Sequence, residues 1–305
     1  MRTAIISHTD CRKHKMIEDH PECASRLDAI NDRILAAGID IALTHLDAPL
    51  VERQQLLMAH SESLIKSVED KIPEQGLVDL DGDTWLCPDS LLAAKRAAGS
   101  GLLAVDKILA GELDAAFCAV RPPGHHATKT TSSGFCIFNN VAVAVRYAQQ
   151  QGIKRIAILD IDVHHGNGTQ DIFIDDMDVL FCSIFQHPFY PNTAIDSNEH
   201  VINTPMTAGM AGDDFERALL HTWFPKLKQF EPELIFISAG FDAHYEDDMG
   251  GLQLVESDYA WFTEQVVSLC KQVNCKGIIS MLEGGYNNSA LGRSVATHVK
   301  ALAEL

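Results

Sequence analysis

The chain has 305 residues, of which 46% are apolar and 22% charged, so it is long and apolar enough to bury one large core. No run approaches the roughly 18 consecutive apolar residues that a membrane span requires, which argues against an integral membrane protein. The net charge of −18 argues against a nucleic-acid-binding protein, because such proteins carry a basic surface. Two interpretations of this charge remain: it keeps the protein soluble, or it attracts a cationic substrate.

Strand-like and helical segments alternate along the chain. Apolar runs rich in β-branched residues predict strands over residues 4–7, 115–120, 155–161, 179–184, 234–238 and 277–282. Helical periodicity predicts helices over residues 24–37, 91–109, 140–151, 213–228, 257–272 and 289–302. This alternation is typical of a single α/β domain, here residues 1–305, with a mostly parallel sheet and helices on both faces. Irregular, polar segments are expected at residues 10–23, 70–88, 128–133, 186–212 and 243–251.

The eight cysteines are scattered without a CxxC pair, and Cys118, Cys136 and Cys182 lie inside apolar runs. Small buried thiols of this kind are typical of a reducing compartment. The first eight residues contain too few apolar side chains for a signal peptide and look like a first strand. Together these features predict a cytoplasmic protein without a disulfide framework.

The strand predicted over 155–161 ends in Asp-Ile-Asp-Val-His, residues 160–164. Because successive strand side chains point to opposite faces, Asp160, Asp162 and His164 would point the same way. Open α/β sheets keep their chemistry at the carboxyl ends of strands. Two carboxylates and an imidazole that converge there could hold a divalent metal ion.

Polar clusters also follow other predicted strands. After residues 115–120, two prolines and a glycine fix a turn that presents His125 and His126. A glycine turn after 234–238 offers Asp242, and a glycine pair that includes Gly284 precedes Tyr286 after 277–282. Because the carboxyl ends of parallel strands meet at one edge of the sheet, we expect these clusters to lie close together.

Three of these side chains form a plausible set of metal ligands. Asp162, His164 and Asp242 would leave one position open, which is the layout of a catalytic zinc site. The ligand types suit Zn²⁺, with Fe²⁺ or Co²⁺ as alternatives. Such a metal would lower the pKa of a bound water molecule and polarise a carbonyl group.

The neighbouring side chains suit the remaining steps of amide hydrolysis. One imidazole of the His125/His126 pair would take a proton from water and pass it to the leaving amine. The Tyr286 hydroxyl would donate a hydrogen bond to the developing oxyanion. Asp160 and Asn167 are the expected partners that orient the two imidazoles. The set therefore predicts metal-assisted hydrolysis of an unactivated amide.

Five long motifs occur in order along the chain: RPPGHHA (121–127), GFCIFNN (134–140), LDIDVHHGNGTQ (159–170), SAGFDAH (238–244) and LEGGYN (282–287). Together they resemble the zinc-dependent histone deacetylase family. The asparagine of HHGNG, the LEGGYN motif and the early HPE…RL (20–27) are most similar to its class II branch and to bacterial deacetylase-like amidohydrolases. The resemblance implies the arginase-like α/β fold and deacylation of N-acyl amines such as acetyl-lysine.

The resemblance also implies roles for single residues. It assigns His126 as the general base and acid and Tyr286 as the oxyanion donor, and it places the zinc ligands on Asp162, His164 and Asp242. A structural potassium ion would use the Asp160 side chain, the Ser183 hydroxyl, and the backbone carbonyls at Asp160, Asp162, His164 and Ile184. A second monovalent site would lie around Phe173.

The resemblance further implies a tunnel that takes the acyl-lysine stem. Gly134, Phe135 and Gly284 would line it, and Tyr190 stands where the family usually has phenylalanine on the opposite wall. Polyamine-specific members carry a glutamate seven residues after the third zinc ligand, where this chain has Met249. The expected substrate is therefore an acylated lysine of a protein or peptide, with an acetylated polyamine as the alternative.

Two other functions compete with a zinc deacylase. An arginase-type ureohydrolase shares the fold but needs a two-metal carboxylate cluster, for which this chain lacks the second set of aspartates. A non-catalytic acyl-lysine binder could lose a histidine or the tyrosine without penalty, yet every catalytic part is present. The oligomeric state stays open.

Several tempting residues have a simpler interpretation. His165 is expected to face away from the site, and His244 is expected to be structural, with a contact at the rim of the site as the alternative. Asp83 is expected to lie in a solvated loop, with a substrate contact as the alternative. The acidic run 246–248 is expected to be solvated.

Overall fold

The computed structural model describes residues 1–193 and 197–305, and its core is an eight-stranded sheet in which every neighbouring pair is parallel. The strand order is β2-β1-β5-β10-β9-β6-β7-β8. The strands are β1 (Thr3–Ser7), β2 (Thr44–Asp47), β5 (Ala115–Cys118), β6 (Ile156–Asp160), β7 (Val179–Gln186), β8 (Val201–Met206), β9 (Leu234–Ala239) and β10 (Ile278–Leu282). A separate antiparallel hairpin joins β3 (Val78–Asp79) and β4 (Trp85–Leu86).

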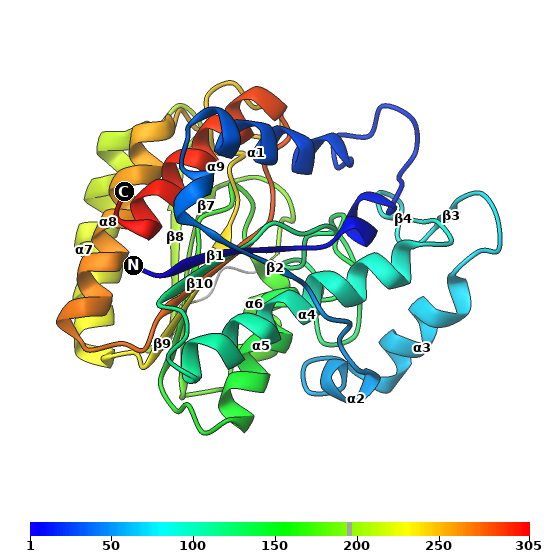
Figure 1. Cartoon of the computed structure of the whole chain (residues 1–305), viewed down its shortest axis with the longest axis horizontal. Helices are drawn as coiled ribbons and strands as arrows, with labels where there is room; N and C mark the ends of the chain where they lie inside the picture. Colours follow the sequence, from blue (N-terminus) through cyan, green and yellow to red (C-terminus); the bar gives the residue numbers. More distant parts are fainter. Residues whose placement is uncertain (194–196) are drawn as a thin grey trace.

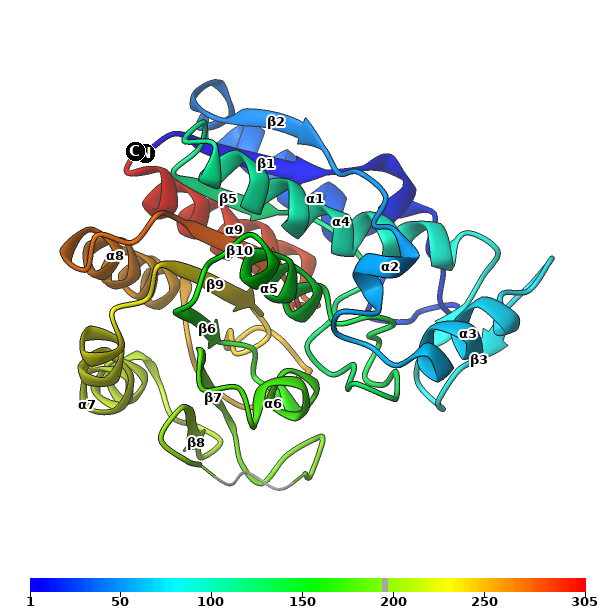
Figure 2. The same cartoon turned by 90° about the horizontal axis from the view of Figure 1, so that it is seen from below.

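Helices cover both faces of the sheet (Figures 1 and 2). One layer contains α4, α5 and α6, and the other contains α7, α8 and α9, with α1 packed against α9. The helices are α1 (Ser25–Ala36), α2 (Arg53–Leu56), α3 (Glu62–Lys71), α4 (Ser90–Leu109), α5 (Asn140–Gln150), α6 (Asn167–Phe173), α7 (Gly212–Phe230), α8 (Glu256–Gln272) and α9 (Asn288–Ala303). Within the described residues, no helix is long and apolar enough to span a bilayer.

The structure confirms the predicted α/β class, the parallel sheet and all six predicted strands. The prediction succeeded because the central strands are continuous apolar runs that are buried on both faces. Two edge strands escaped prediction. β2 is largely exposed and carries mostly polar residues. β8 lies inside the segment 186–212 that we expected to be irregular, because Asn203, Thr204 and Pro205 interrupt its apolar pattern. The hairpin β3–β4 likewise lies in the supposedly irregular segment 70–88.

The sheet order brings the predicted clusters to one edge. The four central strands β5, β10, β9 and β6 are adjacent and parallel, so the loops that follow their carboxyl ends converge. These loops carry the histidine pair, Tyr286, Asp242, and the pair Asp162 and His164. The position matches the general rule that ligands of open α/β sheets bind at the carboxyl ends of the strands.

Helix α4 packs directly against the backbone of the loop that follows β2. Arg96 donates to the Ala48 carbonyl at 2.7 Å, and the Val51 N–H donates to the Lys95 carbonyl at 3.1 Å. At Gly99, an added Cβ would lie 2.0 Å from the Pro49 carbonyl oxygen. Glycine is therefore required here by the close approach of the backbone and not by helix propensity.

We predict that Gly99→Ala lowers the free energy of unfolding by about 2 kcal/mol, because overpacking outweighs the gain of about 0.5–1 kcal/mol that alanine brings to an open helix. Urea denaturation measures the change. Lys95→Ala on the same helix is the control and should stay within about 0.5 kcal/mol of wild type. A more stable Gly99→Ala protein would contradict the close packing.

Candidate active site

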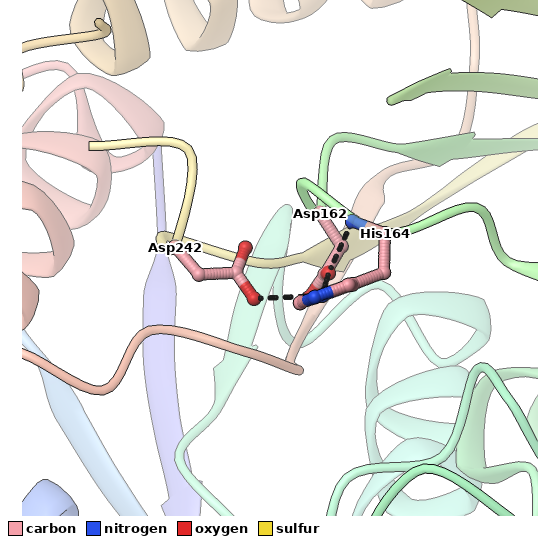
Figure 3. A group of neighbouring side chains, drawn as sticks. All are labelled: Asp162, His164 and Asp242. Carbon is pink, nitrogen blue, oxygen red and sulfur yellow. Dashed lines mark hydrogen bonds and ion pairs between the residues drawn. The ribbon is translucent and has the colours of Figure 1, made fainter. Parts of the chain in front are cut away.

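Two carboxylates and an imidazole meet just beyond the carboxyl ends of β6 and β9 (Figure 3). His164 Nδ1 lies 3.0 Å from Asp162 Oδ1 and 3.3 Å from Asp242 Oδ2. One ligand-type atom from each residue lies within 4.8 Å of the other two, and all three residues are buried. The structure thus brings together Asp162, His164 and Asp242, as the sequence predicts, in a group that could hold a metal ion.

The charge on this group favours a cation at its centre. Burial and the neighbouring Asp162 carboxylate raise the pKa of Asp242 to about 7. Burial alone would lower the pKa of His164, but Asp162 and Asp242 raise it to about 10. Asp242 Oδ2 is buried and accepts no hydrogen bond from the described residues. An imidazole and two carboxylates with an oxygen left over are a donor set that fits Zn²⁺.

Glycines allow the backbone to approach these carboxylates closely. The Gly284 N–H donates to Asp162 Oδ2 at 2.8 Å, and the Val163 N–H donates to Asp242 Oδ1 at 2.9 Å. A Cβ at Gly284 would lie 2.0 Å from Asp242 Oδ2. Gly284 therefore packs against the carboxylates of Asp162 and Asp242, and its place in the tunnel stays a prediction.

The two histidines after β5 lie beside this group and have opposite electrostatic surroundings. His125 Nδ1 lies 3.0 Å from Asp160 Oδ2, and His126 Nδ1 lies 2.7 Å from Asn167 Oδ1, so both predicted partners are in place. Burial alone would lower the pKa of His125, but Asp160 and Asp162 raise it well above its usual value. Burial, with the positive charges of His125 and His164, lowers the pKa of His126 far below it. The pair thus combines a protonated and a neutral imidazole.

A cavity of about 270 Å³ opens onto this arrangement. Of the predicted tunnel residues, Gly134, Phe135, Tyr190 and Met249 line it. Phe189, which the sequence did not single out, also lines it and stacks on His164 with ring centroids 5.4 Å apart. The remaining lining residues are Asp83, His126, His164, Asp248 and Tyr286.

Tyr286 faces the same cavity as His126 and His164. Its ring meets the Phe135 ring edge-on, with centroids 5.7 Å apart, and the Arg26 guanidinium lies 4.9 Å from the ring centroid. Burial and the Asp242 carboxylate raise the pKa of the Tyr286 hydroxyl well above its usual value. The hydroxyl therefore keeps its proton and can act as a donor.

The residues predicted to hold potassium lie around the end of β6. Asp160 pairs with Ser183 across β6 and β7, and the buried Ser183 hydroxyl has no hydrogen-bond partner among the described residues. Ile184 follows on β7 and is buried. Phe173 ends α6 beneath the Arg146 guanidinium, 4.5 Å from its ring centroid.

The sequence analysis missed a buried ionic network behind the histidine pair. Glu283 Oε2 accepts the N–H groups of Gly124 (2.7 Å) and His125 (3.0 Å), which fixes the histidine turn. Arg121 pairs with Glu22, and burial alone would raise the pKa of Glu22, but Arg121 lowers it to about 2. The sequence did offer one indication of this network: Glu22, Arg121 and Glu283 each stand next to a proline or glycine of a motif.

Arg26 connects this network to the Tyr286 loop. Its guanidinium contacts Glu22 Oε1 at 3.2 Å and donates to the Gly285 carbonyl at 2.6 Å. Both Arg26 and Glu22 are fully buried. The HPE…RL segment thus braces the Tyr286 loop through its arginine.

The structure corrects or confirms the simpler interpretations. The run 246–248 is not uniformly solvated: Asp247 is buried, Glu246 pairs with Arg293 at 2.8 Å, and only Asp248 faces the cavity. Asp83 lines the cavity as well. His244 is fully buried, with Nδ1 accepting the Glu246 N–H at 3.1 Å, so it is structural. His165 points away from the cluster, as expected, toward Gln170 and Asn203.

Comparison with known proteins identifies the family. A model described as "Histone deacetylase domain" matches residues 20–302. The chain belongs to the histone deacetylase family. A mouse protein named "Polyamine deacetylase HDAC10" is 35% identical over 99% of this chain, and an Archaeoglobus fulgidus protein named "Probable deacetylase" is 33% identical over 94% of it. The crystal structure titled "Crystal Structure of HDA15 HD domain" matches with a TM-score of 0.94 at 33% identity, covering 99% of this chain and 88% of that one.

Membership in the histone deacetylase family supports a deacetylase, a hydrolase that acts on amides. The fold agrees with the arginase-like architecture that the sequence implied, since the match to the HDA15 domain extends over nearly the whole chain. The chain spans 82% of the archaeal relative but only 48% of the mouse protein, and 46% of an Arabidopsis thaliana relative named "Histone deacetylase 5".

We predict that His164→Ala abolishes stoichiometric binding of Zn²⁺, because Nδ1 of His164 faces both carboxylates. Elemental analysis of dialysed protein measures the metal content. His165→Ala is the matched control: the neighbouring imidazole points away from the cluster, so this variant should lose stability but keep its metal. Stoichiometric zinc in His164→Ala would refute the ligand set.

Proposed function

We propose that the chain is a zinc-dependent deacylase that hydrolyses N-acyl amines, with Nε-acetyl-lysine of proteins or peptides as its substrate. One observation carries the proposal. Asp162, His164 and Asp242 form a buried group, and its His164 lines a cavity of about 270 Å³. The wall of this cavity also contains a neutral imidazole and a protonated phenol, those of His126 and Tyr286.

Asp162, His164 and Asp242 would hold Zn²⁺, with Fe²⁺ or Co²⁺ as alternatives. When bound, the metal would supply a water of lowered pKa and polarise the amide carbonyl. A structural K⁺ is proposed at the end of β6, where Asp160, Ser183 and the backbone carbonyls of Asp160, Asp162, His164 and Ile184 would be its ligands, with a second K⁺ near Phe173. The unpartnered, buried Ser183 hydroxyl supports the first of these sites.

His126 suits the role of general base and acid. Asn167 Oδ1 is a hydrogen-bond acceptor 2.7 Å from Nδ1, so Nδ1 carries the proton and Nε2 keeps its lone pair. The lowered pKa of His126 keeps it neutral and able to accept a proton. It would then deliver this proton to the leaving amine. The charged His125, paired with Asp160, contributes positive potential beside the reacting carbonyl.

The cavity fits a long aliphatic stem and has carboxylates on its wall. Aromatic rings of Phe135, Phe189 and Tyr190 form an apolar passage for the methylene stem of an acyl-lysine. Asp83 and Asp248 place carboxylates on the same cavity. An acetylated polyamine is the second candidate, supported by these carboxylates and by the name of the mouse relative, whereas Met249 in place of a glutamate favours acyl-lysine. We place the enzyme in the cytoplasm because all eight cysteines are free thiols.

We predict that the purified protein deacetylates a fluorogenic acetyl-lysine peptide, and that a chelator abolishes the activity until Zn²⁺ is added back. Acetylated spermidine in the same assay, followed by amine release, tests the second substrate class. Turnover of neither substrate by the zinc-loaded protein would argue for a non-catalytic binder.

We also predict that Tyr286→Phe keeps its metal but lowers kcat by at least about tenfold, because one oxyanion donor is lost. Steady-state kinetics and metal analysis of the same preparation measure both quantities. A near-normal kcat of the variant would contradict the role of the Tyr286 hydroxyl as oxyanion donor.

A further inference from the structure

A single buried carboxylate holds two walls of the cavity together. Asp247 Oδ2 accepts the N–H groups of Tyr286 at 2.6 Å and Asn287 at 2.9 Å. Asp247 Oδ1 accepts the N–H of Met249 at 3.0 Å. Tyr286 and Met249 both line the cavity, and they come from different loops, one after β10 and one after β9. Asp247 is only 4% exposed.

Additional contacts join the same two loops. The Asn287 side chain donates to the Glu246 carbonyl at 2.9 Å and accepts the Ala290 N–H at 3.0 Å, so it also caps α9. Arg293, one turn further along α9, pairs with Glu246 at 2.8 Å. The segment from Glu246 to Met249 is thus anchored to the start of α9, and Asp247 connects that anchor directly to the backbone of Tyr286.

The position of the Tyr286 hydroxyl depends on this backbone. Arg26 also holds this loop, because it donates to the Gly285 carbonyl, but Asp247 accepts the N–H of Tyr286 itself. Hydrogen bonds to an ionised acceptor are about twice as strong as neutral ones. Displacement of a reacting group by about 1 Å is enough to lower a rate about 100-fold.

We infer that Asp247 is a positioning residue for the deacylation reaction, which acts by holding the backbone of Tyr286 at the height its hydroxyl needs to reach the substrate carbonyl. The inference rests on the proposed function, because it gives Tyr286 the donor role described there. Asp247 itself is not among the residues that line the cavity.

A double-mutant cycle tests the inference. Asp247→Ala should lower kcat by about 10- to 100-fold and change KM by less than about threefold, since the lost contact matters in the transition state. The kcat of Asp247→Asn should lie between those of Asp247→Ala and wild type. The single amide oxygen of asparagine can accept backbone N–H groups from only one of the two loops. In a Tyr286→Phe background, Asp247→Ala should change kcat by less than about threefold, because the group it positions is already gone.

A matched control separates this role from general stabilisation. Asp258 is another buried aspartate whose carboxylate accepts a backbone N–H, that of Val255 at 2.8 Å, at the start of α8. Asp258→Ala should lower the melting temperature but leave kcat of the folded protein within about twofold of wild type. Hydrogen exchange of the peptide that contains Tyr286 and Asn287 should accelerate in Asp247→Ala and not in Asp258→Ala.

The outcomes separate this inference from the proposed function. A wild-type protein without metal-dependent deacylation would overturn the proposed function and this role with it. An active wild type in which the losses from Asp247→Ala and Tyr286→Phe multiply would overturn the role of Asp247 alone. The same holds if Asp247→Ala keeps full turnover, or if Asp258→Ala loses as much kcat as Asp247→Ala does.

Discussion

The carboxylates of Asp162 and Asp242 lie side by side in a buried site, and the need to compensate this charge shapes everything around them. Burial of an isolated ion costs several kcal/mol even after relaxation. The negative charge of the two carboxylates is compensated by the N–H groups of Gly284 and Val163 and by the imidazole of His164. A divalent cation would complete this compensation. Glycine at position 284 follows from this constraint, because any side chain would collide with Asp242.

The buried charges around the site also give the two histidines opposite protonation states. Asp160, which sits at the end of β6 and contacts His125, keeps that imidazole protonated. Burial and the resulting positive charge on His125 then keep His126 neutral. Two adjacent residues of one turn therefore reach opposite protonation states, which is the condition for a proton acceptor next to a fixed positive charge.

A third group of interactions holds the loops in register. Glu283 accepts hydrogen bonds from the backbone of the histidine turn, and Arg26 donates to the backbone of the Tyr286 loop. Asp247 connects that loop to the loop after β9. None of these three residues is among those that line the cavity, yet each is buried and hydrogen-bonds to backbone groups. Loops that carry function are mobile by default, and buried charge-assisted hydrogen bonds are one way to make them rigid.

The sequence by itself determined the α/β class, the six inner strands and the residue types of the site, because buried parallel strands are continuous apolar runs and the motifs follow their ends. It could not show β2 and β8, because β2 is largely polar and exposed and the apolar residues of β8 are interrupted by Asn203, Thr204 and Pro205. It also presented the run 246–248 as a solvated acidic stretch. Only the tertiary structure showed that its three carboxylates differ. Glu246 pairs with Arg293, Asp247 is buried and accepts the Tyr286 N–H, and Asp248 lines the cavity. The reason is that burial and hydrogen-bond partners depend on contacts between loops far apart in sequence.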